Sequence, residues 1–228
     1  MAYGKYQEAL PGFAWDAVAL QLYRDGQTYA QDISAAAGMI NLARTNSANN
    51  DTTFYLYQSW ARRSTWDSWL DRDDLTTSDN VVNTREGAEL MLAQVRQATG
   101  ADVYIIPTGD VFYSLGVAIN AGEIQGLTSH QQLYRDNQHA SYDIGRYVAG
   151  LTVFASVYGT EGLSEIVPPD GFYRNTNAIW TPETISDINA VVASVINGHA
   201  DVRTIPEPGV VFFLGTAWVL IGVRRVRV

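Results

Sequence analysis

The sequence has no cysteine, only three histidines and fewer basic than acidic side chains. The absence of cysteine excludes disulfide frameworks, thiol nucleophiles and cysteine-ligated zinc. No two histidines are four residues apart, so we predict no histidine metal site, no metal and no cofactor. With 15 Lys and Arg against 24 Asp and Glu, the formal net charge is −9. We therefore predict no nucleic-acid partner, because phosphate neutralisation needs a basic face.

The remaining composition is that of a folded domain with a distinct C-terminal tail. The 228 residues are 46% hydrophobic and 17% charged, enough to bury a sizeable core in one domain. We expect this domain over residues 1–203 and a tail over 204–228. No basic segment followed by an apolar run begins the sequence, so no signal peptide is visible.

Strand and helix patterns alternate along the domain. Short apolar or β-branched runs predict buried strands, and apolar residues at helical spacing or hydroxyl caps predict helices. The strands are expected at 15–21, 52–57 and 102–107, and the helices at 31–44, 81–98, 111–121, 141–158 and 181–197. Alternation of this kind favours a mainly parallel sheet in a three-layer α/β sandwich. Because three strands are few for a sheet covered on both faces, we expect part of the sheet to come from residues outside this sequence.

The tail has three parts in a fixed order. Pro206-Glu207-Pro208 precedes the uncharged run 209–223, and Arg224, Arg225 and Arg227 follow. A helix of about 15 residues spans about 22 Å, less than the roughly 30 Å hydrocarbon core, although arginine snorkelling and local thinning offset such a mismatch. We expect a hydrophobic transmembrane helix over about 209–223 with a cytoplasmic tip; the alternative is a buried C-terminal helix or strand.

This tail resembles the PEP-CTERM sorting signal of Gram-negative bacteria. The resemblance implies export, recognition and cleavage by an exosortase, and a membrane-anchored domain on the extracytoplasmic side that is released to the surface or matrix after cleavage. It also implies a signal segment at the other end, so we expect Met1 to be a start assigned too far downstream or the gene to be a fragment.

The first chemical candidate is the pair Asp136 and His139 ahead of a predicted helix. A carboxylate three residues before a histidine can bond one ring nitrogen and leave the other as a general base. The alternative is a surface histidine that caps a turn.

Several segments around this pair resemble SGNH (GDSL-like) hydrolases, over about residues 14–158. They are Trp15-Asp16-Ala17-Val18 with Leu20-Gln21, then Phe54 to Tyr57 with Trp60, Arg62 and Arg63, then Ile106-Pro107-Thr108-Gly109, and finally Tyr134 to Ser141 with Gly145 and Tyr147.

The resemblance implies a flavodoxin-like α/β/α fold and ester hydrolysis by a serine that His139 activates and Asp136 orients. It also implies an oxyanion-side amide at Gln21, for which the alternative is a strand-end side chain that bonds loop backbone. The family's Gly-Asp/Asn-Ser nucleophile block is absent, so we expect the domain to lack its first strand or strands. The 228 residues alone are then inactive.

Two further clusters stand between the second and third expected strands. Trp60, Trp66 and Arg62 suit sugars or anionic groups in a substrate-binding loop, and the alternative is that the tryptophans pack onto the body. The second cluster consists of four aspartates, Asp71, Asp73, Asp74 and Asp79. Their spacing lacks the glycine and the final glutamate of an EF-hand calcium loop, so we expect a solvated acidic loop. His130 and His199 have no partner nearby in sequence and are expected on the surface.

The sequence thus predicts an exported, membrane-tethered SGNH-hydrolase-like protein. Its parent activity would be ester hydrolysis, including removal of acetyl groups from polysaccharide. The alternative function is a non-enzymatic surface or matrix protein that keeps the fold as a binding module and uses the tryptophan loop.

Overall fold

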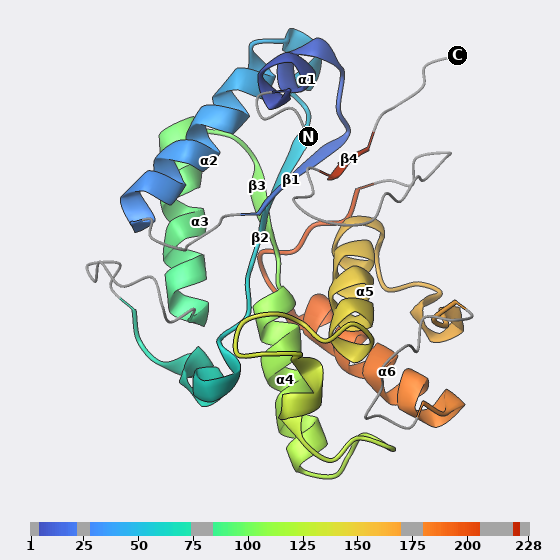
Figure 1. The fold of residues 1–228 in the computed structure, drawn as a ribbon. Coiled ribbons are helices and arrows are strands. Elements are labelled where there is room, and N and C mark those ends of the chain that lie inside the picture. The colour runs from blue at the N-terminus through green and yellow to red at the C-terminus, as the bar shows by residue number, and fades with distance from the viewer. Residues whose placement is uncertain (1–4, 22–27, 74–83, 170–179, 206–220, 224–228) are drawn as a thin grey trace.

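The structure is a computed structural model that describes residues 5–21, 28–73, 84–169, 180–205 and 221–223. The helices and strands are labelled in Figure 1. In chain order they are α1 (Tyr6–Gly12), β1 (Ala17–Gln21), α2 (Tyr29–Arg44), η1 (Ser47–Asn49), β2 (Thr53–Tyr57), η2 (Arg63–Leu70), α3 (Arg85–Thr99), β3 (Val103–Ile106), α4 (Thr108–Asn120), η3 (His130–Leu133), α5 (Ile144–Tyr158), η4 (Leu163–Glu165), α6 (Pro182–Gly198) and β4 (Ile221–Val223).

A small sheet with the strand order β3-β2-β1-β4 forms the centre of the fold. β1 pairs with β2 and β2 with β3, both in parallel. Gln21 lies opposite Tyr57, and Tyr57 lies opposite Ile106, so the three strands end together at one edge. This edge is called the carboxyl edge below. The predicted α/β class and parallel pairing are confirmed for these three strands.

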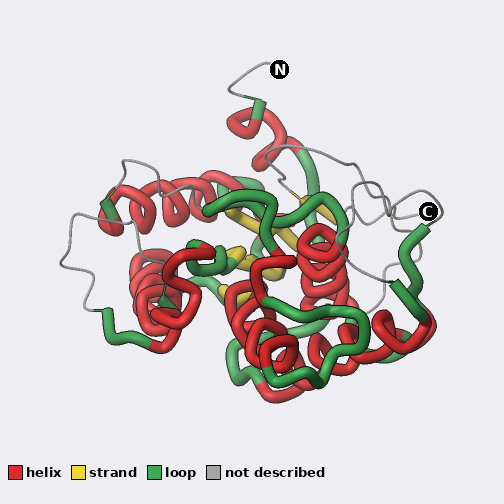
Figure 2. Tube along the Cα trace, turned by 60° about the horizontal axis from the view of Figure 1, so that its bottom comes forward, coloured by secondary structure: helices red, strands yellow, loops and turns green. Residues whose placement is uncertain are grey.

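Helices cover both faces of the sheet (Figures 1 and 2). Because successive strand residues point to opposite faces, each strand contributes to two cores. One face packs against α2 and α3 through Val18, Leu20, Phe54, Leu56, Val103 and Ile105. The other face, with Ala19 and Tyr55, packs against Val157 of α5 and against Ile205.

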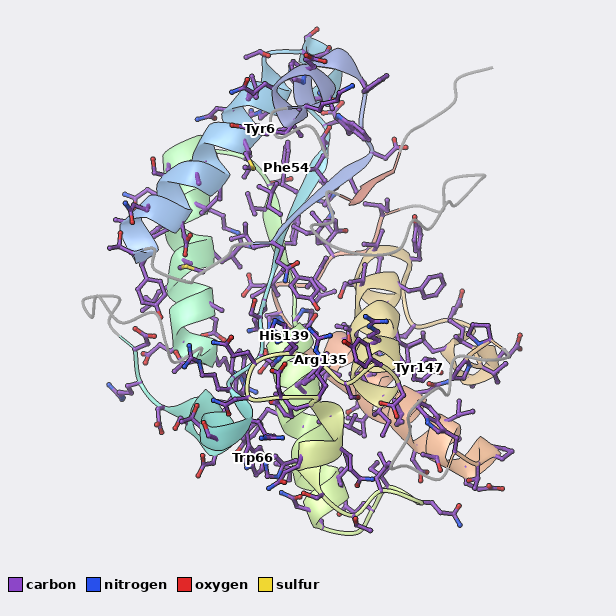
Figure 3. The ribbon with its side chains drawn as sticks, viewed as in Figure 1. Tyr6, Phe54, Trp66, Arg135, His139 and Tyr147 are labelled. Atoms are coloured by element: carbon purple, nitrogen blue, oxygen red, sulfur yellow. The ribbon has the colours of Figure 1, made fainter. Side chains whose placement is uncertain are left out.

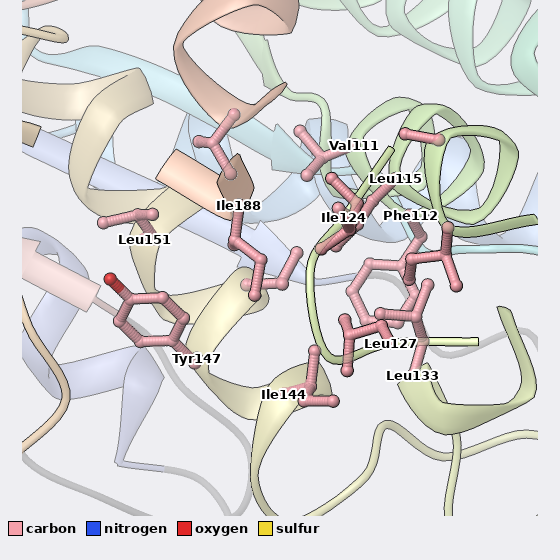
Figure 4. Packing of buried hydrophobic residues seen from close by; sticks show 14 of the residues in the cluster. Val111, Phe112, Leu115, Ile124, Leu127, Leu133, Ile144, Tyr147, Leu151 and Ile188 are labelled. Carbon is pink, nitrogen blue, oxygen red and sulfur yellow. The ribbon is translucent and has the colours of Figure 1, made fainter. Parts of the chain in front are cut away.

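A third core lies among α4, α5 and α6, beyond the carboxyl edge. Val111 and Phe112 of α4, Leu151 of α5 and Ile188 of α6 are buried in it together with Leu133 of η3 (Figure 4). The segment between α4 and α5 is therefore fixed on the body by Leu133. This segment carries Asp136 and His139.

The helix starts follow the local signals in the sequence. Thr181 caps α6 by accepting the Thr184 N–H at 3.2 Å, with Pro182 in the first turn, as predicted. Ser141 accepts the Gly145 N–H at 2.8 Å, although α5 begins at Ile144. Each of the five predicted helices occurs within a few residues of its expected bounds.

The C-terminal tail differs from the predicted transmembrane helix at the three residues of that helix that the structure describes. Pro206, Glu207 and Pro208 and most of the expected helix 209–223 lie outside the described residues. Ile221–Val223 forms strand β4, antiparallel to β1, instead of the end of a helix. The predicted helix is thus wrong at these three residues, where backbone pairing with the open edge of β1 competes with helix formation. Within the described ranges, every helix is too short or too polar to cross a bilayer.

Candidate functional site

The carboxyl edge gathers the segments that follow β2 and β3. In open parallel sheets, side chains beyond the carboxyl ends of the strands form the usual ligand crevice. Tyr57, Gln58 and Ser59 at the end of β2 line a small pocket there, closed by Ala88 and Met91 of α3. The candidate site is therefore sought among the residues that border this edge.

A short two-stranded turn carries the Asp-x-x-His motif. Tyr134 bridges Ala140 in an antiparallel arrangement, and the Arg135 N–H donates to the His139 carbonyl at 3.0 Å. Below it, the Ser141 N–H donates to the Leu133 carbonyl at 2.8 Å. These bonds fold residues 134–140 back on themselves, which places the Asp136 carboxylate beside the His139 ring.

The Asp136 carboxylate and the His139 ring form a close local pair. His139 Nδ1 lies 2.8 Å from Asp136 Oδ2, and the Gln138 and His139 N–H groups each donate to Oδ1 at 2.8 Å. Desolvation raises the pKa of Asp136, but these hydrogen bonds outweigh it and bring that pKa to about 2. The ionised carboxylate therefore accepts the Nδ1–H, and Nε2 is left as the proton acceptor of the ring.

The His139 ring faces outward. Its side chain is 58% exposed, and Nε2 has no hydrogen-bond partner among the described residues. Figure 3 shows His139 and Arg135 in front of the start of α4, below the strands. An oriented imidazole with an open nitrogen can accept a proton from a bound reactant.

Three hydrogen bonds dock this turn onto the loop that follows β2. Trp60 Nε1 donates to the Gln138 carbonyl at 2.9 Å. The Arg63 N–H donates to the Asn137 carbonyl, and the Ser64 N–H to Asn137 Oδ1, both at 2.9 Å. Because this loop leaves β2 at the carboxyl edge, the Asp136–His139 pair borders that edge.

Gln21 ends β1 at the same edge, with an exposed side chain. Within the described residues, no hydrogen bond joins it to Asp136 or His139. A different amide is buried here: Gln58 Oε1 accepts the Asp110 N–H at 3.1 Å. Gln58 directly follows a buried strand in the sequence. A polar residue at that position is a signal for the carboxyl edge, and this signal could have identified Gln58 as a candidate.

The predicted substrate-binding tryptophans pack onto the body. Trp60 is stacked on Phe112 with ring centroids 4.3 Å apart, and Trp66 is stacked on His130 at 4.4 Å. Both indoles are partly buried, which is the alternative that the sequence left open for this loop. Arg62 is also partly exposed, and its guanidinium has no ion pair in the described part of the chain.

A second aspartate–histidine pair, which the sequence did not indicate, is buried behind the edge. His199 Nε2 lies 3.5 Å from Asp110 Oδ2, and the two side chains are 11% and 3% exposed. Asp110 Oδ1 accepts from Trp69 Nε1 at 3.0 Å and from Arg85 Nε. Burial raises the pKa of Asp110, but the close contact with His199 and the hydrogen bonds from Trp69 and Arg85 together lower it.

The expected surface position is therefore wrong for His199, and Asp73 is not simply solvated, whereas His130 is partly exposed as a surface residue can be. Packing of α6 against α4 buries His199, and the stack on Trp66 partly covers His130. Asp73 is bonded as well, since its carboxylate accepts from Tyr29 Oη at 2.6 Å and from Thr84 Oγ1 at 3.1 Å. Asp74 and Asp79 lie outside the described residues. The described side chains contain no cluster of three or more potential metal ligands.

Fold and site together define an α/β protein with an outward-facing Asp–His pair at the carboxyl edge of a parallel sheet. The chain is similar to the crystal structure of a DUF4886 family protein from Bacteroides uniformis, with a TM-score of 0.51 and 18% identity. The match covers 84% of this chain and 66% of the DUF4886 chain, so this chain spans about two thirds of the length of the DUF4886 protein. At this identity the likeness concerns the fold alone. No family model and no curated protein matches the sequence.

Proposed function

We propose that this domain hydrolyses esters in the manner of SGNH hydrolases, including acetyl esters of polysaccharide. The observation that carries the proposal is the bond between ionised Asp136 and His139 Nδ1, with Nε2 open at the carboxyl edge. In this proposal His139 is the general base and Asp136 orients it. Gln21 keeps its expected role as a donor to the developing oxyanion.

The reaction needs a serine hydroxyl, which the resemblance places in a Gly-Asp/Asn-Ser block ahead of Trp15. The serine oxygen attacks the ester carbonyl carbon while His139 Nε2 takes the hydroxyl proton. The histidine returns that proton to the leaving alcohol, and the acyl group remains on the serine. Water, deprotonated by His139, then releases the acid and regenerates the serine.

The sheet supports the flavodoxin-like fold in which that block would lie. Among the described residues, the side of β1 away from β2 pairs with the three residues of β4, in antiparallel orientation. A further parallel strand on this edge would continue the order β3-β2-β1 and would end at the carboxyl edge near Gln21. A serine directly after such a strand would then face His139.

Replacing His139 with alanine is expected to lower kcat on p-nitrophenyl acetate by about 10²- to 10⁴-fold, the usual contribution of a general base. The assay uses the chain extended upstream of Met1 to include the serine block. His130→Ala is the matched control, because that ring stacks on Trp66 away from the pair, and we expect unchanged turnover. Equal rates for wild type and His139→Ala would remove His139 from the mechanism.

The tail is proposed as an exosortase sorting signal that tethers the domain to the membrane from the extracytoplasmic side. The support is the order of Pro206-Glu207-Pro208, the uncharged run and the terminal arginines. Insertion of the run would require β4 to leave β1, and β4 is only three residues long.

A reporter fused after Val228 is expected to lie in the cytoplasm of a Gram-negative host, because flanking arginines stay on the cytoplasmic side. Alkaline phosphatase fused there should be inactive, whereas the same enzyme fused after Ile205 of an exported chain should be active. An active phosphatase after Val228 would show that the proposed topology is wrong.

A further inference from the structure

A pair of arginines borders the Asp136–His139 turn on its exposed side. The guanidinium carbons of Arg135 and Arg146 lie 4.7 and 4.5 Å from the ring centroid of Tyr142. Arg135 Nη1 also donates to the Tyr142 hydroxyl. All three side chains are exposed, and the tyrosine restricts the two cations to one small area of the surface.

A similar arrangement elsewhere in the molecule shows how such cations are normally neutralised. Arg96 and Arg203 lie 5.6 and 5.3 Å from the ring centroid of Tyr104. Each of them has its own carboxylate, since Arg96 pairs with Asp201 at 2.7 Å and Arg203 with Asp102 at 3.2 Å. The Tyr104 cluster is therefore electrically balanced by its own residues.

The Tyr142 cluster is not balanced in this way. Asp136 Oδ2 lies 3.5 Å from Arg135 Nε, but the same carboxylate already accepts the His139 ring N–H and two backbone N–H groups. Arg146 has no carboxylate within 4.0 Å in the described part of the chain. Arg62 and Arg63, on the loop docked against Asn137, likewise form no ion pair there.

These exposed guanidinium groups, of which Arg146 has no carboxylate within 4.0 Å in the described part of the chain, stand on a chain with a net charge of −9. The negative electrostatic potential of such a chain repels anions. An anion can therefore approach most easily where basic side chains are concentrated. Guanidinium groups bind carboxylate and phosphate oxygens through parallel N–H donors, and their stacking on a ring reduces the entropy lost on binding. The open Nε2 of His139 lies on the turn next to Arg135.

We infer that Arg146, assisted by Arg135, binds a carboxylate or phosphate group of the substrate beside His139. The inference rests on the proposed function and narrows its substrate class to esters on anionic carbohydrates. The arginines position the anionic sugar, while Asp136 and His139 act on the neighbouring ester.

The test measures binding without turnover, so it is independent of the esterase assay. Full-length ¹⁵N-labelled protein is titrated with glucuronate, glucose 6-phosphate and glucose, and the backbone amide resonances of residues 135–146 are followed by NMR. We expect saturable shifts with an anionic sugar and none with glucose; the two anions distinguish carboxylate from phosphate as the group bound. Arg146→Gln should weaken that binding about tenfold, the usual range for one charge-assisted contact.

Arg203→Gln is the matched control, because it removes the same charge from the balanced cluster at Tyr104 and should leave the Kd unchanged. Equal Kd values for wild type and Arg146→Gln would overturn the inference, as would glucose binding as well as the anions or no saturation by either anion. The two proposals can fail separately. If anion binding is saturable and depends on Arg146, but His139→Ala leaves the rate of ester hydrolysis unchanged, the anion subsite is supported and only the esterase proposal is refuted.

Discussion

Replacing Asp110 with alanine is expected to lower the free energy of unfolding by about 3 kcal/mol. The carboxylate is 3% exposed and accepts hydrogen bonds from Trp69 and Arg85, with His199 on its other oxygen. Its removal leaves the buried Trp69 N–H without its acceptor and the His199 ring without the carboxylate 3.5 Å away. The value lies at the low end for a broken buried ion pair because Arg85 is 40% exposed and can be rehydrated.

Urea denaturation at pH 7 measures this loss, with Asp102→Ala as the control. Asp102 also pairs with an arginine, Arg203, at 3.2 Å, but it is 77% exposed. An exposed pair of this kind contributes about 0 to 1 kcal/mol. If the two variants lost the same stability, the buried network at Asp110 would not hold α3, α4 and the end of α6 together.

The contribution of Asp110 should also depend on pH in a defined direction. Its pKa is lowered in the folded protein, and the unfolded value for aspartate is about 3.9. The stabilisation is therefore complete above the unfolded pKa and is lost as pH falls through the folded one. We expect the stability advantage of wild type over Asp110→Asn, measured by urea denaturation at each pH, to be present at pH 5 and to shrink below about pH 4.

Local sequence signals were sufficient to predict the Asp136–His139 pair, because the two residues are three positions apart on one turn. The same holds for the helix capped by Thr181 and for the three parallel strands, whose apolar runs are short and continuous. The His199–Asp110 pair could not be predicted in this way. It forms only when α6 packs on α4, and nothing near either residue in sequence specifies that contact.

Two other features that the sequence did not predict, helix α1 and the burial of Trp69, also depend on tertiary contacts. Helix α1 (Tyr6–Gly12) contains Pro11 and buries only Leu10, so its existence depends on packing against α2 and not on its own periodicity. The tryptophan loop contains the polar pattern of a surface segment, yet Trp69 is fully buried on α4 beside Gly109. In each case a tertiary contact overrides the local pattern.

Gly145→Ala is expected to destabilise the protein by about 1 to 3 kcal/mol, the usual cost of overpacking. A Cβ at this position would lie 2.3 Å from the Leu133 carbonyl oxygen and 2.9 Å from Ala140 Cβ. Because the first contact is with backbone, α5 or the Asp136–His139 turn must move. The Leu133 carbonyl already accepts the Ser141 N–H at 2.8 Å, so its displacement also loosens the base of that turn.

Gly150→Ala provides the control on the same helix, since nothing lies within 4 Å of a Cβ built there. Replacing a glycine inside a helix by alanine without a clash stabilises by about 0.5 to 1 kcal/mol. The two variants should therefore shift Tm in opposite directions, and only Gly145→Ala should perturb the NMR signals of His139. If both raised Tm, the close approach of α5 to Leu133 would be absent. If Gly145→Ala lowered Tm but left the His139 signals unchanged, α5 would not position the turn that carries the pair.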